Sequence, residues 1–376
     1  MTCNVVRLGD VAKITSGFAF KSSYFNDSGE GLPLVRIRDV TTGSSETFYS
    51  GEFKEEFLIE DGDALIGMDG EFNLAKWRGG KALLNQRVCK VQAASRHVDQ
   101  EYLIRFLPLA LKRIEEMTPF VTVKHLSVKD LRDVEVPVPP ISEQRRIAAL
   151  LDKAETLSVM RRKAVAKIDQ VCQAVFFDMF GDPAANPMGW RKLSLEQLVV
   201  VDAPLVDPRE REYQDLFHFG PDRIAKDTGR LLAAKTARED GLISKKFLCD
   251  SRHILYSKIR PYLNKVALVK ERCLCSADVY PVEPKRELTR RFLWHILRSK
   301  DFLDHAASFS NRANIPKINR EQFLQYECVV PPLEVQEKFD RLSTKLEALR
   351  VASENSAGRL DDLFSGLQQR AFSGEV

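Results

Sequence analysis

Apolar residues recur at intervals of three and four in two long segments of the chain, which is the pattern of a helix with one packed face. Shifting the numbering by 192 superimposes the two patterns. Both patterns weaken at the middle, where Arg161 and Ala164 correspond to Ser353 and Ser356. The predicted seam residues are Ile147, Leu150, Leu157, Ile168 and Val171 in the first helix and Phe339, Leu342, Leu346, Leu349, Leu360, Leu363 and Leu367 in the second.

The matched registers predict that the two helices pack against each other. The alternative is that each helix packs only on its own globular domain, as amphipathic surface helices commonly do. A charged substitution within the seam would distinguish the two arrangements.

A proline pair precedes each helix, as Val138-Pro139-Pro140-Ile141 with Gln144 and as Val330-Pro331-Pro332-Leu333 with Gln336. Proline fixes φ and keeps the preceding residue extended, so each pair predicts a rigid joint between a strand and a helix. The first helix ends near Phe180-Gly181, before a segment rich in proline and glycine.

The segments before the two joints also resemble each other, which indicates an internal repeat. Gly62–Gly67 matches Arg252–Ser257, and Asn85–Val88 falls opposite Cys275–Asp278. Short strand-like runs and turns together with a helical stretch predict mixed α/β domains. The expected organisation is a first domain at 1–138, a helix at 139–180, a linker at 181–189, a second domain at 190–330 and a helix at 331–376.

Composition supports two ordinary folded domains, since 376 residues with 44% hydrophobic and 29% charged residues exceed one comfortable core. No stretch resembles a signal peptide or a membrane span, which favours a cytoplasmic protein. The seven scattered cysteines predict free thiols. A net charge of +4 permits a polyanionic partner without requiring one.

Motifs for catalysis are incomplete. Gly79-Gly80-Lys81 lacks the first glycine and the hydroxyl residue of a phosphate-binding loop. Neither proline pair has the Asn or Asp and the aromatic residue that a DNA amino-methyltransferase needs. Asp278 with Glu283-Pro284-Lys285 matches the motif of a metal-dependent nuclease only weakly. Pro284 would interrupt the strand that should present the lysine. Cys273 and Cys275 lack a second pair at zinc-site spacing.

Basic and amide residues at predicted turns remain as candidates for DNA contact, because Arg and Asn reach base edges while Lys mostly contacts phosphates. In the first domain Arg36 and Arg38 flank a strand-like run, and Lys76, Arg78, Lys81, Gln86 and Arg87 surround the glycine pair. In the second they are Lys245, Lys246, Lys258, Arg260, Tyr262, Lys265, Arg312, Asn314 and Lys317.

The repeated Pro-Pro-x-x-x-Gln before a long heptad helix resembles the specificity subunits of type I restriction-modification systems. Pro139 to Gln144 matches closely, whereas Glu334-Val335-Gln336 reverses the usual order of acid and glutamine. Leu8-Gly9-Asp10-Val11 resembles the opening of a target-recognition domain. The resemblance implies two target-recognition domains and an antiparallel coiled coil.

The same resemblance implies a non-catalytic chain that reads an asymmetric bipartite site on double-stranded DNA. Its implied partners are two methyltransferase subunits and restriction subunits that translocate DNA. S-adenosylmethionine, ATP and Mg are expected only in those partners, with no cofactor or metal in this chain. Two other functions stay open: an endonuclease or methyltransferase with an unrecognised motif, and a coiled-coil scaffold that binds proteins.

Overall fold

The computed structural model describes residues 4–117, 124–309 and 316–373 and divides the chain into two compact units. Unit 1 contains residues 1–162 and 355–376, and unit 2 contains residues 163–354. Each unit therefore includes a part of both long helices, α5 (Ile141–Phe180) and α10 (Leu333–Ser373). Within the described residues, no helix is both long enough and apolar enough to cross a membrane.

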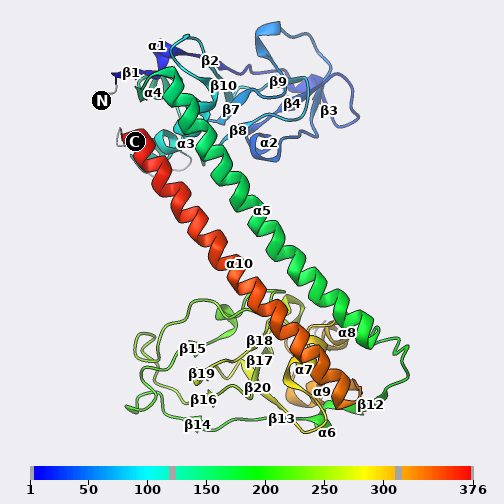
Figure 1. The fold of residues 1–376 in the computed structure, drawn as a ribbon. Coiled ribbons are helices and arrows are strands. Elements are labelled where there is room, and N and C mark those ends of the chain that lie inside the picture. The colour runs from blue at the N-terminus through cyan, green and yellow to red at the C-terminus, as the bar shows by residue number, and fades with distance from the viewer. Residues whose placement is uncertain (1–3, 118–123, 310–315, 374–376) are drawn as a thin grey trace. The chain divides into compact units, whose positions relative to one another are not determined.

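In the part of unit 1 that the structure describes there are three small sheets (Figure 1). The first pairs β1 with β11, the second has the order β2-β10-β7-β8, and the third has the order β3-β5-β4-β9-β6. The strands are β1 (Asn4–Arg7), β2 (Ala12–Ser16), β3 (Phe25–Asn26), β4 (Leu32–Val35), β5 (Phe48–Tyr49), β6 (Leu58–Ile59), β7 (Ala64–Gly67), β8 (Leu74–Lys76), β9 (Ala82–Leu84), β10 (Val88–Ala93) and β11 (Glu135–Val138).

Helix α3 covers the second sheet of unit 1 with an apolar face that includes Tyr102, Phe106 and Leu107. Phe364 and Phe372 of α10 pack against the same core, so the end of the chain completes this unit. The helices of unit 1 besides α5 and α10 are α1 (Leu8–Val11), α2 (Ile37–Thr42), α3 (Gln100–Met117) and α4 (Val128–Arg132).

Unit 2 repeats much of this plan. A two-stranded sheet pairs β12 with β21, and two four-stranded sheets have the orders β13-β20-β17-β18 and β14-β16-β19-β15. The strands are β12 (Arg191–Ser194), β13 (Val199–Val201), β14 (Leu205–Val206), β15 (His218–Phe219), β16 (Lys246–Cys249), β17 (Ile254–Ser257), β18 (Val266–Leu268), β19 (Cys273–Cys275), β20 (Val279–Pro284) and β21 (Glu327–Val330); the helices are α6 (Leu195–Leu198), α7 (Arg290–Ile296), α8 (Lys300–Ser308) and α9 (Arg320–Leu324).

The predicted repeat and the mixed α/β class are confirmed by these matching sheets, but one predicted register is wrong. Val88 of β10 lies opposite Gly67 of β7, and Val279 of β20 lies opposite Ser257 of β17. Val88 therefore corresponds to Val279, one residue later than the sequence match placed it. The connecting loops of the two units differ in length, and a single sequence does not show where such insertions fall.

The two proline joints are held by buried glutamines in the same way. The Gln144 side chain donates to the carbonyls of His97 (2.7 Å) and Pro139 (2.8 Å) and accepts from the Asp99 amide (2.8 Å). Gln336 donates to Glu287 (3.0 Å) and Pro331 (2.8 Å) and accepts from Thr289 (2.9 Å). Both side chains are fully buried. Each glutamine ties the start of a long helix to the loop before α3 or α7.

Segments of α5 and α10 contact each other within each unit. In unit 1, Ser158 donates to Asp361 (2.5 Å), and Arg162 pairs with the same carboxylate (2.8 Å). In unit 2, the ring of Phe339 lies 5.5 Å from that of Phe176. The helices therefore contact each other as well as their own domains.

Along each helix, about every second residue of the predicted seam lies exposed, and a neighbouring residue is buried in its place. Ser158 and Ser343 are only 4% and 3% exposed, whereas the neighbouring Leu157 and Leu349 are 43% and 57% exposed. The inward positions include Ser158, Ser343 and Arg350, which no hydrophobic pattern marks. Ile147 and Phe339 are buried as predicted, and Ile168, Leu346, Leu360 and Leu367 are partly buried. The predicted seam residues that lie exposed are Leu150, Leu157, Val171, Leu342, Leu349 and Leu363.

His295 of α7 makes the stability of unit 2 depend on pH. Its ring packs against those of Phe176 (5.3 Å) and Phe339 (4.9 Å), and burial lowers its pKa to about 3. Below about pH 6.5 the His295 imidazole binds a proton in the unfolded chain but stays neutral in the folded chain. The free energy of unfolding therefore falls as the pH falls. Between pH 6.5 and pH 5 we expect the free energy of unfolding to drop by about 2 kcal/mol more in the wild type than in His295→Phe. Equal losses in urea titrations would contradict this.

Candidate nucleic-acid interface

Three loops of unit 2 meet at one end of the β13-β20-β17-β18 sheet. The Lys258 amide donates to the Asp278 carbonyl (3.1 Å), and the Ile318 amide donates to the Lys258 carbonyl (3.0 Å). These bonds join the β17–β18 loop to the β19–β20 loop and to the segment before α9. We call this surface the unit 2 loop edge, formed by Lys258–Lys265, Ser276–Asp278 and Pro316–Ile318.

Unit 1 has the same construction. The Met68 amide donates to the Arg87 carbonyl (2.9 Å), and the Leu126 amide donates to the Met68 carbonyl (2.8 Å). Here the joined loops are β7–β8, β9–β10 and the segment before α4. We call this surface the unit 1 loop edge, formed by Met68–Asn73, Asn85–Arg87 and Lys124–Leu126.

The unit 2 loop edge gathers most of the cationic residues predicted in that half of the chain. Lys258 lies 3.5 Å from Asp278 and 5.9 Å above the ring of Tyr280. Lys265 donates to the Pro221 carbonyl (2.6 Å). The predicted residues Arg260, Tyr262 and Lys317 on this edge are exposed.

Lys245 and Lys246 lie towards the same end of the strands, because β16 begins where β19 ends and Phe247 is paired with Cys275. Lys246 donates to the Ser244 side chain (2.5 Å). Arg312 and Asn314 lie outside the described residues. Unit 2 therefore presents a largely basic surface, as phosphate contacts require.

Unit 1 brings fewer of its predicted residues to its loop edge. Arg36 lies beside this edge, because Val35 accepts from the Asn85 amide (3.2 Å), and its guanidinium lies 5.3 Å over the Phe25 ring. Gln86 is exposed. Arg87 is exposed too, and its Nε lies 3.4 Å from Asp69.

Two residues of the unit 1 loop edge were not foreseen. The Asp69 carboxylate lies 2.5 Å from His125 Nδ1 as well as beside Arg87. His125 lies far from both in the sequence, so only the folded chain brings these three side chains together. The carboxylate places Arg87 at the surface with its charge partly compensated.

The other predicted cations of unit 1 do not lie with Gln86 and Arg87. Strand β9 separates the Gly79-Gly80 turn from the loop edge, so the expected single cluster around the glycines is wrong. At the glycine end, Lys76 pairs with Glu101 (2.5 Å) and Lys81 with Glu60 (3.7 Å). Arg78 is exposed at that end, and Arg38 on α2 lies 3.6 Å from Asp39.

A partly buried ion pair lies next to the unit 2 loop edge. Arg223 donates to both oxygens of Asp240 (2.6 and 2.8 Å), and this holds the pKa of Asp240 below its usual range. Arg223 belongs to the short 3-10 turn Pro221–Arg223, whose first carbonyl accepts from Lys265. The pair therefore fixes the backbone that orients Lys265.

The nuclease-like residues do not assemble into a site. Glu283 pairs with Arg252 (3.2 Å), which also pairs with Asp250 (2.9 Å) and lowers the pKa of that carboxyl to about 2. Asp278 lies at the other end of β20 and faces Lys258. Among the described residues, no group of three or more His, Cys, Asp or Glu is placed to hold a metal ion.

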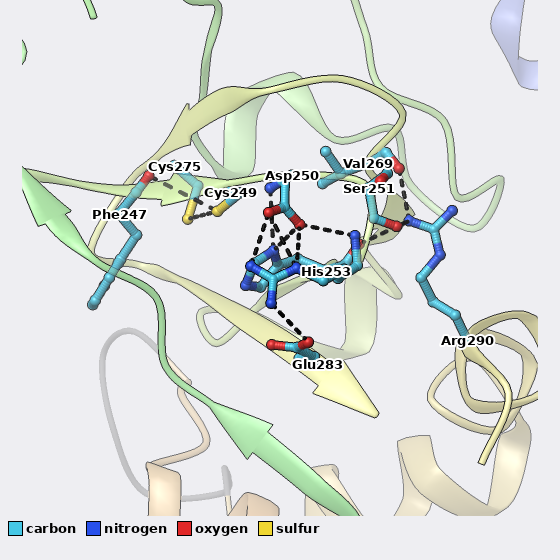
Figure 2. A network of polar contacts seen from close by, with 10 residues as sticks. Phe247, Cys249, Asp250, Ser251, His253, Val269, Cys275, Glu283 and Arg290 are labelled. Carbon is cyan, nitrogen blue, oxygen red and sulfur yellow. Dashed lines mark hydrogen bonds and ion pairs between the residues drawn. The ribbon is translucent and has the colours of Figure 1, made fainter. Parts of the chain in front are cut away.

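Most cysteine side chains of the described residues are buried in the hydrophobic cores. Cys249 lies 3.4 Å from Cys275 across β16 and β19 (Figure 2), and every cysteine in the described residues is free. Burial raises the pKa of Cys89 to about 12. The Cys89 thiol is therefore protonated and packed in the core of unit 1.

Both units of this duplicated α/β chain present joined loops at one end of their strands. The model of the type I restriction modification DNA specificity domain matches residues 2–167 and 232–355, and the chain belongs to this family.

The chain is 42% identical over 168 residues to the type I restriction enzyme EcoBI specificity subunit of Escherichia coli, which covers 45% of this chain and 35% of that protein. It is 26% identical over an alignment of 412 residues to the EcoDI specificity subunit of Escherichia coli, covering 99% and 88%.

Solved structures share the fold. The type I restriction-modification S subunit from M. genitalium has a TM-score of 0.64 at 11% identity and covers 99% of this chain and 96% of its own. A chain from a structure of the type I R-M system, titled for its complex assembly and conformational transition, has a TM-score of 0.58 at 17% identity and covers 99% and 98%.

Proposed function

We propose that this chain is the non-catalytic subunit that selects the DNA sequence for a type I restriction-modification complex. Each unit contacts one half of a bipartite site on double-stranded DNA through its loop edge. One observation carries the proposal: the two loop edges share their backbone hydrogen bonds but differ in nearly every exposed side chain. Two loop edges with the same backbone structure but different side chains can contact two half-sites of different sequence.

The long helices connect the two halves as an antiparallel coiled coil. Contacts within the units support this arrangement, because the first half of α5 meets the second half of α10 in unit 1 and the second half of α5 meets the first half of α10 in unit 2. The polar positions along the seam include Arg350, which lies 3.9 Å from Asp169. Such pairs favour one register over its alternatives.

Two methyltransferase subunits dock on the outer faces of these helices. The exposed seam candidates form repeat pairs, Leu150 with Leu342, Leu157 with Leu349 and Val171 with Leu363. Along each helix these exposed apolar residues recur at heptad spacing, which is the pattern of a surface that packs against another helix. Since the pairs are equivalent, they provide two like surfaces for two copies of one partner.

The complex works in the cytoplasm. S-adenosylmethionine belongs to the methyltransferase subunits, and ATP and Mg belong to restriction subunits that translocate DNA. Within this chain, the residues of each loop edge bind and orient DNA.

The function is tested by changing cations on one loop edge. In the chain assembled with its modification subunits, Lys258→Ala or Lys317→Ala should weaken binding to every duplex sequence. Each should reduce the slope of log affinity against log salt by about 0.9, which is the value for one phosphate contact. Lys285→Ala is the matched control, because Lys285 follows β20 at the opposite end of the same sheet. Unchanged salt slopes for both test variants would contradict the proposal.

A further inference from the structure

Arg260 has a backbone conformation that L-residues rarely adopt. Its φ is 47°, in the left-handed region. Its amide donates to the Pro316 carbonyl (2.7 Å). In unit 1 the corresponding residue is Gly70, with a φ of 75°, and its amide donates to the Lys124 carbonyl (2.9 Å). The same turn is thus occupied by glycine in one unit and by arginine in the other.

Glycine adopts this conformation without steric cost, whereas arginine does so under strain. Crowding does not explain the difference, because a Cβ added at Gly70 would meet nothing within 4 Å. The backbone alone therefore favours glycine at both positions. Strain of this kind persists where the side chain has a function.

The Arg260 side chain contributes nothing evident to the fold. It is exposed, and no described residue forms a hydrogen bond or an ion pair with its guanidinium. The packing of the unit does not account for its presence.

The β17–β18 loop of unit 2 is also longer than the β7–β8 loop of unit 1 and carries side chains better suited to contact DNA. The Ser257 amide bonds to Lys265, whereas the equivalent Gly67 amide bonds to Asn73, so the loop in unit 2 is longer. The longer loop carries Tyr262, which is 57% exposed. The shorter loop carries Asp69 and Glu71, and its Phe72 is buried; the residues that correspond to Lys258 and Lys265 are Met68 and Asn73.

We propose that the strained turn of the β17–β18 loop presents Arg260 to a base edge in the major groove, and that the equivalent loop of unit 1 does not read bases. The guanidinium fork matches the O6 and N7 atoms of guanine, which is the commonest specific contact of arginine with DNA. In unit 1 the corresponding position is Gly70, which has no side chain that could reach a base edge. This inference rests on the proposed function and names one residue that determines specificity.

The experiment compares Arg260→Gly and Arg260→Lys with the control Arg286→Gly. Arg286 is exposed and follows β20 at the opposite end of the same sheet. Each full-length chain, purified with its modification subunits, selects sequences from a library of random DNA duplexes. Thermal unfolding of each protein is measured in parallel.

We expect Arg260→Gly to unfold at or above the wild-type midpoint and to lose its preference for guanine at one position of one half-site. Affinity for the wild-type sequence should fall between about fivefold and a hundredfold. Arg260→Lys should keep the salt dependence but lose the same preference, because lysine lacks the planar fork. The second half-site and the control should be unchanged.

Each contrary result has a distinct meaning. An unchanged selected sequence in Arg260→Gly would overturn the inference while the proposed function stands. An equal loss for all sequences, with a smaller salt slope, would make Arg260 a phosphate contact and also overturn it. A lower unfolding midpoint would contradict the strain argument. A wild-type complex that selects no sequence would overturn the proposed function and this inference together.

Discussion

A chain that carries both Leu157→Asp and Leu349→Asp should remain folded but lose its methyltransferase subunits. Both leucines are about half exposed, so a carboxylate at either position stays hydrated in the free chain. In the proposed interface the same carboxylate would be buried without a partner, which costs several kcal/mol. We expect each helix face to lose about 2 kcal/mol or more of binding, at least thirtyfold in affinity. Sedimentation of the mixed subunits measures this loss.

The control variant carries Lys153→Asp and Lys345→Asp. These lysines are also repeat partners and are exposed on the same two helices, so each helix receives the same new carboxylate with a charge change of two units instead of one. If the leucine variant fails to fold, the leucines belong to the helix seam after all. If it folds and still binds two methyltransferase subunits, the exposed leucines are not the docking surface.

Replacing either buried glutamine by leucine should destabilise the unit that contains it. Gln144→Leu or Gln336→Leu leaves one amide and two carbonyls without their partner in a buried joint. Each unsatisfied group costs about 1 to 3 kcal/mol, so we expect a loss of about 3 to 5 kcal/mol in the free energy of unfolding. Urea denaturation followed by tryptophan fluorescence gives this value.

Gln369→Leu is the control for this loss, since Gln369 is exposed near the end of α10. It should change the free energy of unfolding by less than about 0.5 kcal/mol. A loss of 1 kcal/mol or less at both joints would mean that water replaces the glutamines without difficulty and that the prolines alone set the direction of each helix.

The sequence by itself determined the repeat, the two long helices and the joints before them. These features depend on local chemistry, because proline restricts φ, heptad spacing marks a helix, and the same signals occur twice. The sequence also showed that Gln144 and Gln336 occupy equivalent positions of the repeated motif. It did not show the hydrogen bonds that their side chains form. The predicted family followed from these same residues.

The side of each helix that is buried was decided by the tertiary structure. Leu157 and Ser158 are neighbours, and hydrophobicity alone favours the leucine for the seam. In the folded unit, Ser158 satisfies its hydroxyl with Asp361 and lies inside, while Leu157 is left outside. Periodicity cannot separate such adjacent positions when a small polar residue packs well.

The loop edges were decided by the tertiary structure as well. Asp69, Arg87 and His125 are distant in sequence, and only the paired loops bring them together. Lys76 and Arg87 are both cations near the glycine pair in sequence, yet one strand separates them in space. The difference between Gly70 and Arg260 appears only when both occupy the same left-handed turn, because backbone conformation is a property of the folded loop and not of the residue alone.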